Sequence, residues 1–162
     1  MVAWGRMAAL AVGLAAQGAW AQDEGSVELR LGGEDHIFVV LGKEAGTAIE
    51  GPDEGRTVTL VAAPEAGGDE ADRLPRLTVA FLVEGVGNDA TLSEPRILFE
   101  DAEGRRYRPS EGMTGTVTLD SITEIGGSVI LSGEFSAELS REEGGGGPLG
   151  ASGDFQTTFE TE

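Results

Sequence analysis

The clearest pattern in the chain lies between Ser128 and Leu139, where apolar and polar residues alternate. The apolar positions of one parity are Val129, Leu131, Phe135, Ala137 and Leu139. Serine and glutamate occupy most of the other parity, and Ile130 is the exception. A period of two over so long a segment is typical of a β-strand with one buried and one solvated face. We expect this strand to be the centre of an all-β domain.

Shorter segments with related patterning predict further strands, which gives about nine strands in all. They are residues 27–31, 37–41, 58–62, 77–83, 97–99, 105–108, 115–121 and 155–159. Segment 37–41 is apolar on both parities, so we expect it to be covered on both faces. Segments 64–72 and 142–153 are polar and rich in glycine, which predicts flexible loops. The frequent turns and the lack of helical periodicity predict an antiparallel β-sandwich or a partly closed barrel.

One hairpin can be predicted down to its register. The sequence Asp-Ala-Glu-Gly at 101–104 suits a type I turn that ends in a glycine bulge. This turn places Phe99 opposite Tyr107 and Glu100 opposite Arg106. Both cross-strand pairs are favourable, since one joins two aromatic rings and the other joins opposite charges.

Several motifs occur in a fixed order from about residue 77 to residue 160. They are F-x-D-x-x-G-x-x-Y at 99–107, GTVTL at 115–119, SGEFSA at 132–137 and GDF at 153–155. In these motifs the chain resembles a group of uncharacterised secreted bacterial β-sandwich proteins. The resemblance implies a sandwich closed by a G-x-F-x-A strand, and it implies no catalytic residues.

The first 21 residues have the pattern of a cleaved signal peptide. Arg6 supplies a positive charge, an apolar run follows from 7 to 16, and Ala19-Trp20-Ala21 forms a cleavage site. The apolar run is shorter than the roughly 20 residues that a membrane span needs. We expect cleavage after Ala21 and export of residues 22–162, as a single all-β domain without stable membrane anchoring, to the periplasm or the cell exterior.

Composition narrows the classes of partner. The chain has 29 acidic residues against 11 lysines and arginines, a net charge of −18. Such a chain repels phosphates, so nucleic acid is not an expected partner. The chain has no cysteine, so no disulfide can stabilise the fold.

The candidates for chemistry are few. His36 is the single histidine, and with Glu34 and Asp35 it could bind a metal, or it could simply lie at the edge of a turn. No serine lies in a G-x-S-x-G context, so the motif of many hydrolases is absent from the sequence. The sequence therefore predicts neither a catalytic residue nor a metal site, and it predicts no cofactor.

Charged segments give three more candidates. Two acidic segments approach the composition of a calcium loop, Asp69-Glu70-x-Asp72 and Glu100-Asp101-x-Glu103-Gly104. Neither has the ligand spacing of a calcium-binding loop, so we interpret both as solvated loops. The basic cluster comprises Arg105, Arg106 and Arg108. These arginines could bind an anion or could neutralise Glu100 and other carboxylates across the hairpin.

The sequence favours a non-catalytic binding or structural module of the cell envelope, whose partner is a protein or a small molecule. Two alternatives stay open. One is a hydrolase that uses a carboxylate pair or calcium. The other is an accessory subunit that pairs an exposed strand edge with its partner.

Overall fold

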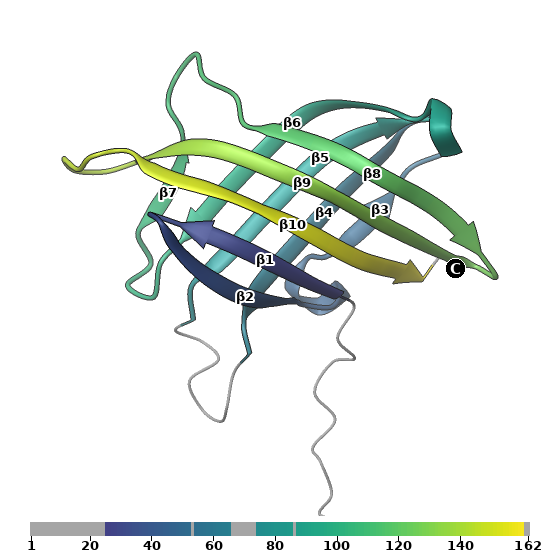
Figure 1. Cartoon of the computed structure of the whole chain (residues 1–162), viewed down its shortest axis with the longest axis horizontal. Coiled ribbons are helices and arrows are strands. Elements are labelled where there is room, and N and C mark those ends of the chain that lie inside the picture. The colour runs from purple at the N-terminus through teal and green to yellow at the C-terminus, as the bar shows by residue number, and fades with distance from the viewer. Residues whose placement is uncertain (1–24, 53, 66–73, 86, 161–162) are drawn as a thin grey trace, which may run out of the picture.

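A computed structural model describes residues 25–52, 54–65, 74–85 and 87–160. These residues form an all-β structure, an antiparallel sheet of ten strands with two short 3₁₀ helices (Figure 1). The strands are β1 (Gly25–Leu31), β2 (Glu34–Val40), β3 (Ala48–Glu50), β4 (Arg56–Pro64), β5 (Arg76–Glu84), β6 (Thr91–Glu100), β7 (Arg106–Pro109), β8 (Thr116–Ile125), β9 (Ser128–Arg141) and β10 (Leu149–Glu160). The helices are η1 (Lys43–Ala45) and η3 (Gly87–Asp89). The all-β prediction is confirmed.

Strand β9 is the one on which the sheet is organised, as its patterning predicts. One edge of β9 pairs with β10, and the other edge pairs with β8 and, near its end, with β7. From β10 the pairings continue through β1, β2, β4, β5, β6 and β7. The series of paired strands therefore returns to β9. In Figure 1 the strands β1, β8, β9 and β10 lie in front of β4, β5 and β6 and run in a different direction.

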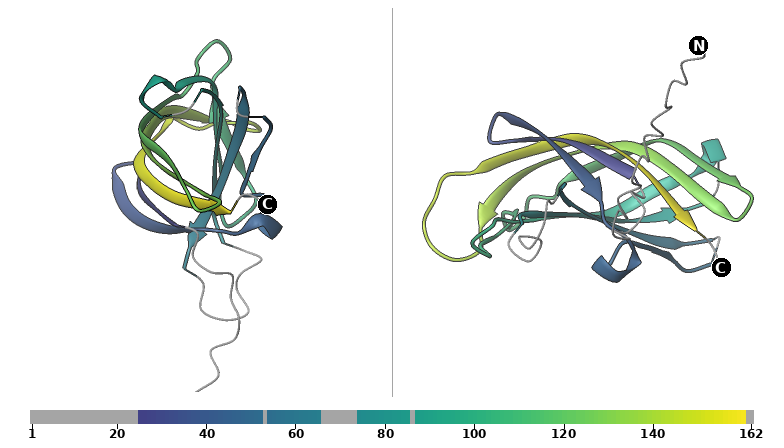
Figure 2. Two further views of the ribbon diagram at one scale, coloured as in Figure 1. Left: turned by 90° about the vertical axis from the view of Figure 1, so that its right-hand side faces the viewer. Right: turned by 90° about the horizontal axis from the view of Figure 1, so that it is seen from below.

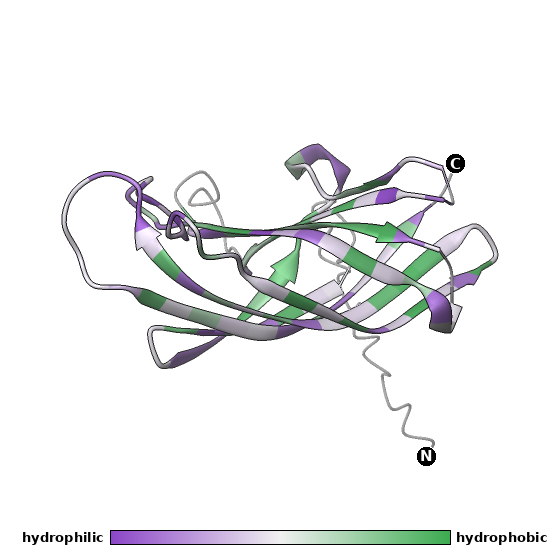
Figure 3. Ribbon diagram, turned by 90° about the horizontal axis from the view of Figure 1, so that it is seen from above, coloured by the Kyte–Doolittle hydropathy of each residue, from purple (hydrophilic) through white to green (hydrophobic). Residues whose placement is uncertain are grey.

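The core lies between these two groups of strands and is built by alternation. In β5 the buried residues are Leu77, Val79, Phe81 and Val83, and in β9 they include Val129, Leu131, Phe135 and Leu139. Apolar and polar bands accordingly alternate along the strands in Figure 3. Strand β4 departs from strict alternation, since its residues 60–63 are all buried.

Glycines bring β9 and β10 close to their neighbours at two points. Phe155 in β10 is directly opposite Gly133 in β9, and Gly153 in β10 is directly opposite Phe135. A Cβ atom on Gly133 would lie 2.9 Å from Cζ of Phe155. Each aromatic ring therefore occupies space that the opposite residue leaves empty, which compensates for the missing side chain.

The predicted hairpin is confirmed in its register and its turn. Phe99 pairs with Tyr107 and Glu100 pairs with Arg106. The Gly104 N–H donates to the Asp101 carbonyl, and Gly104 has a φ of 79°. That left-handed conformation favours glycine and completes the bulge.

Three predictions about boundaries and exposure need correction. The predicted loop 142–153 is too long, because β10 begins at Leu149. The loop 64–72 begins too early, because Pro64 is the last residue of β4, and residues 66–73 lie outside the described residues. Segment 37–41 is not covered on both faces, since Ile37 is 73% exposed. The sequence patterning also missed β3, a strand of 3 residues that pairs with β4.

An ion pair joins strands that do not pair through their backbones. The Arg56 side chain at the start of β4 is 8% exposed and lies 3.3 Å from Glu124 Oε2 at the end of β8. Arg56 shares its parity with buried Val58, so its side chain points towards the core. The pair ties β8 to the strands on the far side of the core.

Candidate functional site

A groove of about 750 Å³ lies on the outer face of β1, β2, β9 and β10. Most of its lining residues share the outward-facing parity of their strands, and Leu29, His36, Phe135 and Gly153 of the other parity also border it. The outward-facing residues include Glu28, Arg30, Asp35, Ile37, Glu134, Ser136, Ser152 and Asp154. The serines are small, so they leave room between the longer charged side chains. The groove is therefore a polar site formed by strands that are far apart in the sequence.

A row of three carboxylates crosses the groove. Glu28 in β1 is directly opposite Asp154 in β10, and Asp154 is directly opposite Glu134 in β9. Neighbouring strands lie about 4.8 Å apart, so these like charges are close neighbours on one face. Like charges that are directly opposite each other destabilise a sheet. The row thus carries an energetic cost that ordinary solvated charges avoid.

The cations near this row do not neutralise it. Arg30 lies in the groove, but its ion pair is with Asp35, with 3.6 Å between the charged atoms. Among the described residues, no ion pair or hydrogen bond of a side chain engages Glu28, Glu134 or Asp154. The groove therefore presents uncompensated negative charge to solvent.

The first half of β2 borders the groove and extends beyond the part of β2 that pairs with β4. β2 pairs with β4 only from Phe38 to Val40, so within the described residues no strand pairs with that edge from Glu34 to Ile37. These four residues are exposed on both faces. Figure 2 shows the β1–β2 hairpin extending away from the other strands. Its turn is Gly32-Gly33, with φ values of 59° and 92°, as a two-residue hairpin requires.

His36 does not form a metal site with its two acidic neighbours in the described structure. Successive strand residues point to opposite faces, so Asp35 points away from Glu34 and His36. The His36 ring instead packs edge-on against Phe38, with 6.3 Å between the ring centroids. No group of three or more histidine and acidic side chains in the described ranges is arranged to hold a metal ion.

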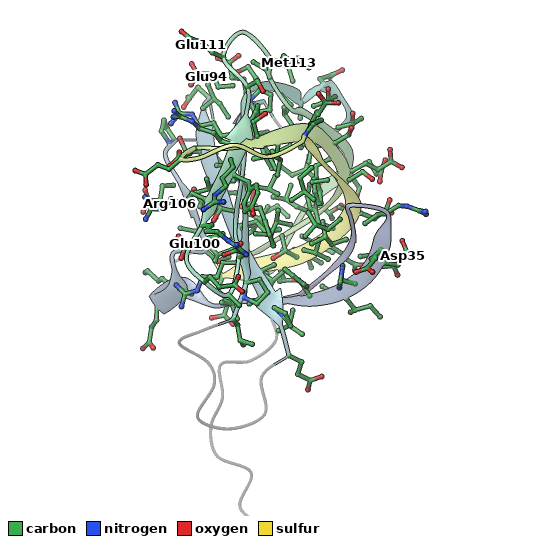
Figure 4. The ribbon with its side chains drawn as sticks, turned by 90° about the vertical axis from the view of Figure 1, so that its left-hand side faces the viewer. Asp35, Glu94, Glu100, Arg106, Glu111 and Met113 are labelled. Atoms are coloured by element: carbon green, nitrogen blue, oxygen red, sulfur yellow. The ribbon has the colours of Figure 1, made fainter. Side chains whose placement is uncertain are left out.

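The arginine cluster lies elsewhere, on the β6–β7 hairpin, and it pairs with carboxylates. Arg106 bonds Glu100 at 3.1 Å, which confirms the predicted neutralisation, and Arg108 contacts Glu142 at 3.3 Å. Arg105 bonds both Asp101 and Glu103. In Figure 4 this hairpin, marked by Glu100 and Arg106, lies apart from Asp35, one of the residues that line the groove.

Asp101 organises the turn of that hairpin. Its Oδ1 accepts hydrogen bonds from the backbone N–H groups of Glu103 and Arg105, at 3.0 and 2.9 Å. Its Oδ2 accepts from the Arg105 guanidinium and from the Tyr107 hydroxyl. Burial raises the pKa of Asp101, but the bonds and charge of Arg105 outweigh it, so the pKa lies below the ordinary value. The carboxylate is therefore used as a structural acceptor, which argues against a calcium ligand there.

The acidic segment Asp69–Asp72 lies outside the described residues. In the part of the chain that the structure describes, no helix has the length and apolar character needed to cross a membrane.

No family model, no curated protein and no solved structure matches the chain.

The groove is the feature that sequence reasoning missed. The alternation correctly predicts Glu28 and Glu134 on the polar faces of their strands, but Asp35, Ser152 and Asp154 lie outside the predicted strands. The sequence also does not say which strands are neighbours. The like-charged row appears only when β1, β10 and β9 are placed side by side. The sequence does contain one indication of the row, since each of β1, β9 and β10 has an acidic residue near its middle on the polar face.

Proposed function

We propose that the protein is a non-catalytic binding module, exported to the periplasm or the cell exterior after cleavage at Ala21. Its partner is an extended, positively charged segment that lies on the outer groove. The observation that carries this proposal is the row Glu28, Asp154 and Glu134, whose side chains form no ion pair among the described residues. A cationic partner would remove a repulsion of about 0.2–1 kcal/mol for each directly opposite pair.

The shape of the groove supports a partner rather than a reaction. Its carboxylates stand on an open face and are all exposed. A glycoside hydrolase needs two carboxyl groups on either side of an enclosed bond, and one of them must hold a proton. An open row of solvated carboxylates suits electrostatic attraction, which chiefly speeds association and selects partners by charge.

We also propose that residues 22–162 form one domain whose sheet closes into a partly closed barrel rather than a two-layer sandwich. The support is the series of pairings that leads from β9 through β10 and back to β9 through β7. The closure is partial, because β6 pairs with β7 only at Phe99 and Glu100. Among the described residues, the rest of β6 has no backbone partner on that side.

A binding experiment with a simple polycation tests the groove. Fluorescence anisotropy would follow a labelled, capped hexalysine peptide at low ionic strength, where screening is weak. The variant replaces the row by Glu28→Gln, Glu134→Gln and Asp154→Asn. Its matched control, Glu44→Gln with Glu84→Gln and Glu111→Gln, removes the same charge from exposed positions outside the groove.

We expect the row variant to bind at least about tenfold more weakly than the control, a difference of about 1.4 kcal/mol. The loss of affinity caused by each triple variant should become smaller between about 0.01 M and 0.15 M salt, because the Debye length falls. Equal weakening by the two triple variants would show that the peptide senses net charge alone, and the groove would then lose its assigned role.

A further inference from the structure

The edge of the β1–β2 hairpin differs from the other unpaired edges of the sheet. From Glu34 to Ile37, β2 has no described strand beside it and is exposed on both faces. The corresponding edge of β6 is interrupted by Glu94, whose φ is 52°, and by Pro95, which has no N–H to donate. The free edge of β8 lies next to β6 and η3. The outer edge of β3 is also unpaired in the described structure, but it spans only 3 residues, two of which are half-buried. The hairpin edge is thus the most open of these sites for an added strand.

We propose, on the basis of the function proposed above, that the partner binds by adding an extended strand to this edge of β2. Strand addition uses backbone hydrogen bonds for affinity and alternate side chains for specificity. Ile37 connects the edge to the groove, because it lines the groove and is directly opposite Glu28 in β1. At 73% exposure it is the most exposed of the large apolar side chains in the described structure.

The side chains of the edge specify the chemistry of the added strand. Ile37 and Asp35 share the outer face, whereas Glu34 and His36 share the other face. A strand that complements them carries an apolar residue opposite Ile37 and basic residues opposite Asp35 and Glu34. A second copy of this chain is a poor occupant, because it carries the same carboxylates at its edge and the same net charge of −18, so the two copies repel each other.

A short peptide designed for this register tests the inference. Capped Thr-Val-Thr-Lys-Lys-Thr, run antiparallel to β2, sets valine opposite Ile37 and the two lysines opposite Asp35 and Glu34. Two N-methylated forms of the peptide block alternate sets of its backbone N–H groups. They have the same charge and side chains, but in only one of them are the N–H groups that face β2 blocked. Titrations of the whole exported chain would use Ile37→Thr and, as the matched control, Ile125→Thr, another exposed isoleucine on the β8–β9 hairpin.

We expect one N-methylated form to bind about tenfold more weakly, the loss expected for one or two net hydrogen bonds, and the other form to bind like the parent peptide. Ile37→Thr should weaken binding about fivefold through lost apolar contact, and Ile125→Thr should leave it unchanged. If the two methylated forms bind equally, or if the two isoleucine variants behave alike, strand addition at β2 is overturned.

The same titrations separate this inference from the groove. If both methylated forms bind like the parent peptide and the row variant binds hexalysine much more weakly, the proposed role of the groove is supported and strand addition is refuted. If only one methylated form loses binding and the row variant binds hexalysine like its control, strand addition is supported and the proposed role of the groove is refuted. A dimer of the chain that Ile37→Thr dissociates would show that a second copy occupies the edge, contrary to the proposal.

Discussion

The ring of Phe135 in β9 lies over Gly153, the residue directly opposite in β10. A Cβ atom on Gly153 would come within 3.1 Å of Cε1 of Phe135, and it would come closer still to the Glu28 carbonyl oxygen in β1. Gly153 therefore fits between two neighbours, one a buried ring and the other a backbone group that cannot easily move.

Gly153→Ala should destabilise the protein by about 1–3 kcal/mol, the usual cost of overpacking. Gly150→Ala is the matched control in the same strand, because a Cβ there meets nothing within 4 Å. That control should be neutral or slightly stabilising, since alanine lowers the entropy of the unfolded chain. Urea unfolding of both variants measures the difference, and a similar loss for the two would refute the close packing at Gly153.

Phe135→Ala should cost about 3–5 kcal/mol, because it removes a large side chain and leaves a cavity. Phe135 is 3% exposed, whereas its neighbour Ser136 is exposed on the outer face. Ser136→Ala should therefore cost well under about 1 kcal/mol. Denaturant midpoints of the two variants give the comparison, and equal losses would mean that the faces of β9 are wrongly assigned.

Asp101→Asn should reduce stability at pH 7 by about 1–2 kcal/mol, because charge-assisted bonds to the turn are weakened. The folded pKa of Asp101 is lowered, so its contribution is complete above the unfolded value of about 3.9 and is lost as the pH falls through the folded pKa. The difference between wild type and variant should thus stay constant from pH 7 to about pH 5 and shrink at lower pH.

Unfolding free energies across that pH range test the role of Asp101. Glu103→Gln is the control, since the Glu103 side chain is 66% exposed and bonds the Arg105 guanidinium at 2.8 Å. It should cost less than about 0.5 kcal/mol at pH 7. If the difference in unfolding free energy between wild type and Asp101→Asn stays the same at acid pH, the charge of Asp101 does not stabilise the turn as proposed.

Asp154→Asn should stabilise the protein, by up to about 1 kcal/mol at low salt, because it removes the middle charge of the row. The gain should decline as sodium chloride screens the two remaining carboxylates. Glu138→Gln offers a comparison on β9, where the opposite residue is Gly150 and no like charge is directly opposite. Thermal melts at two salt concentrations suffice, and a destabilised Asp154→Asn would show that the row is not repulsive.

Local features of the fold could be predicted from the sequence, whereas long-range neighbours could not. The register of Phe99 with Tyr107 follows from turn chemistry within a few residues, and the buried face of β9 follows from alternation. The start of β10 was missed because Gly150 and Gly153 resemble loop residues until Phe135 is seen to cover one of them.

Exposure also depends on neighbours that the sequence does not name. Ile37 lies in an apolar run that predicts coverage of both faces, but β4 ends before it reaches this part of β2. The alternation predicts solvated positions for Glu28 and Glu134, whereas Asp154 falls between a predicted loop and a predicted strand. Their arrangement as a row depends on the pairing of β1 with β10, two strands at opposite ends of the described chain.

That pairing has a consequence for the order of folding. Ser26 is directly opposite Gln156, so the first of the described strands to be synthesised is paired with the last of them. Contacts between such distant parts of a chain make folding slow, because a long loop must close before they form. The series of paired strands can therefore be completed only after β10 has been synthesised. Until then β1 and β9 present unpaired edges, and the high negative charge of the chain keeps such partly folded molecules apart.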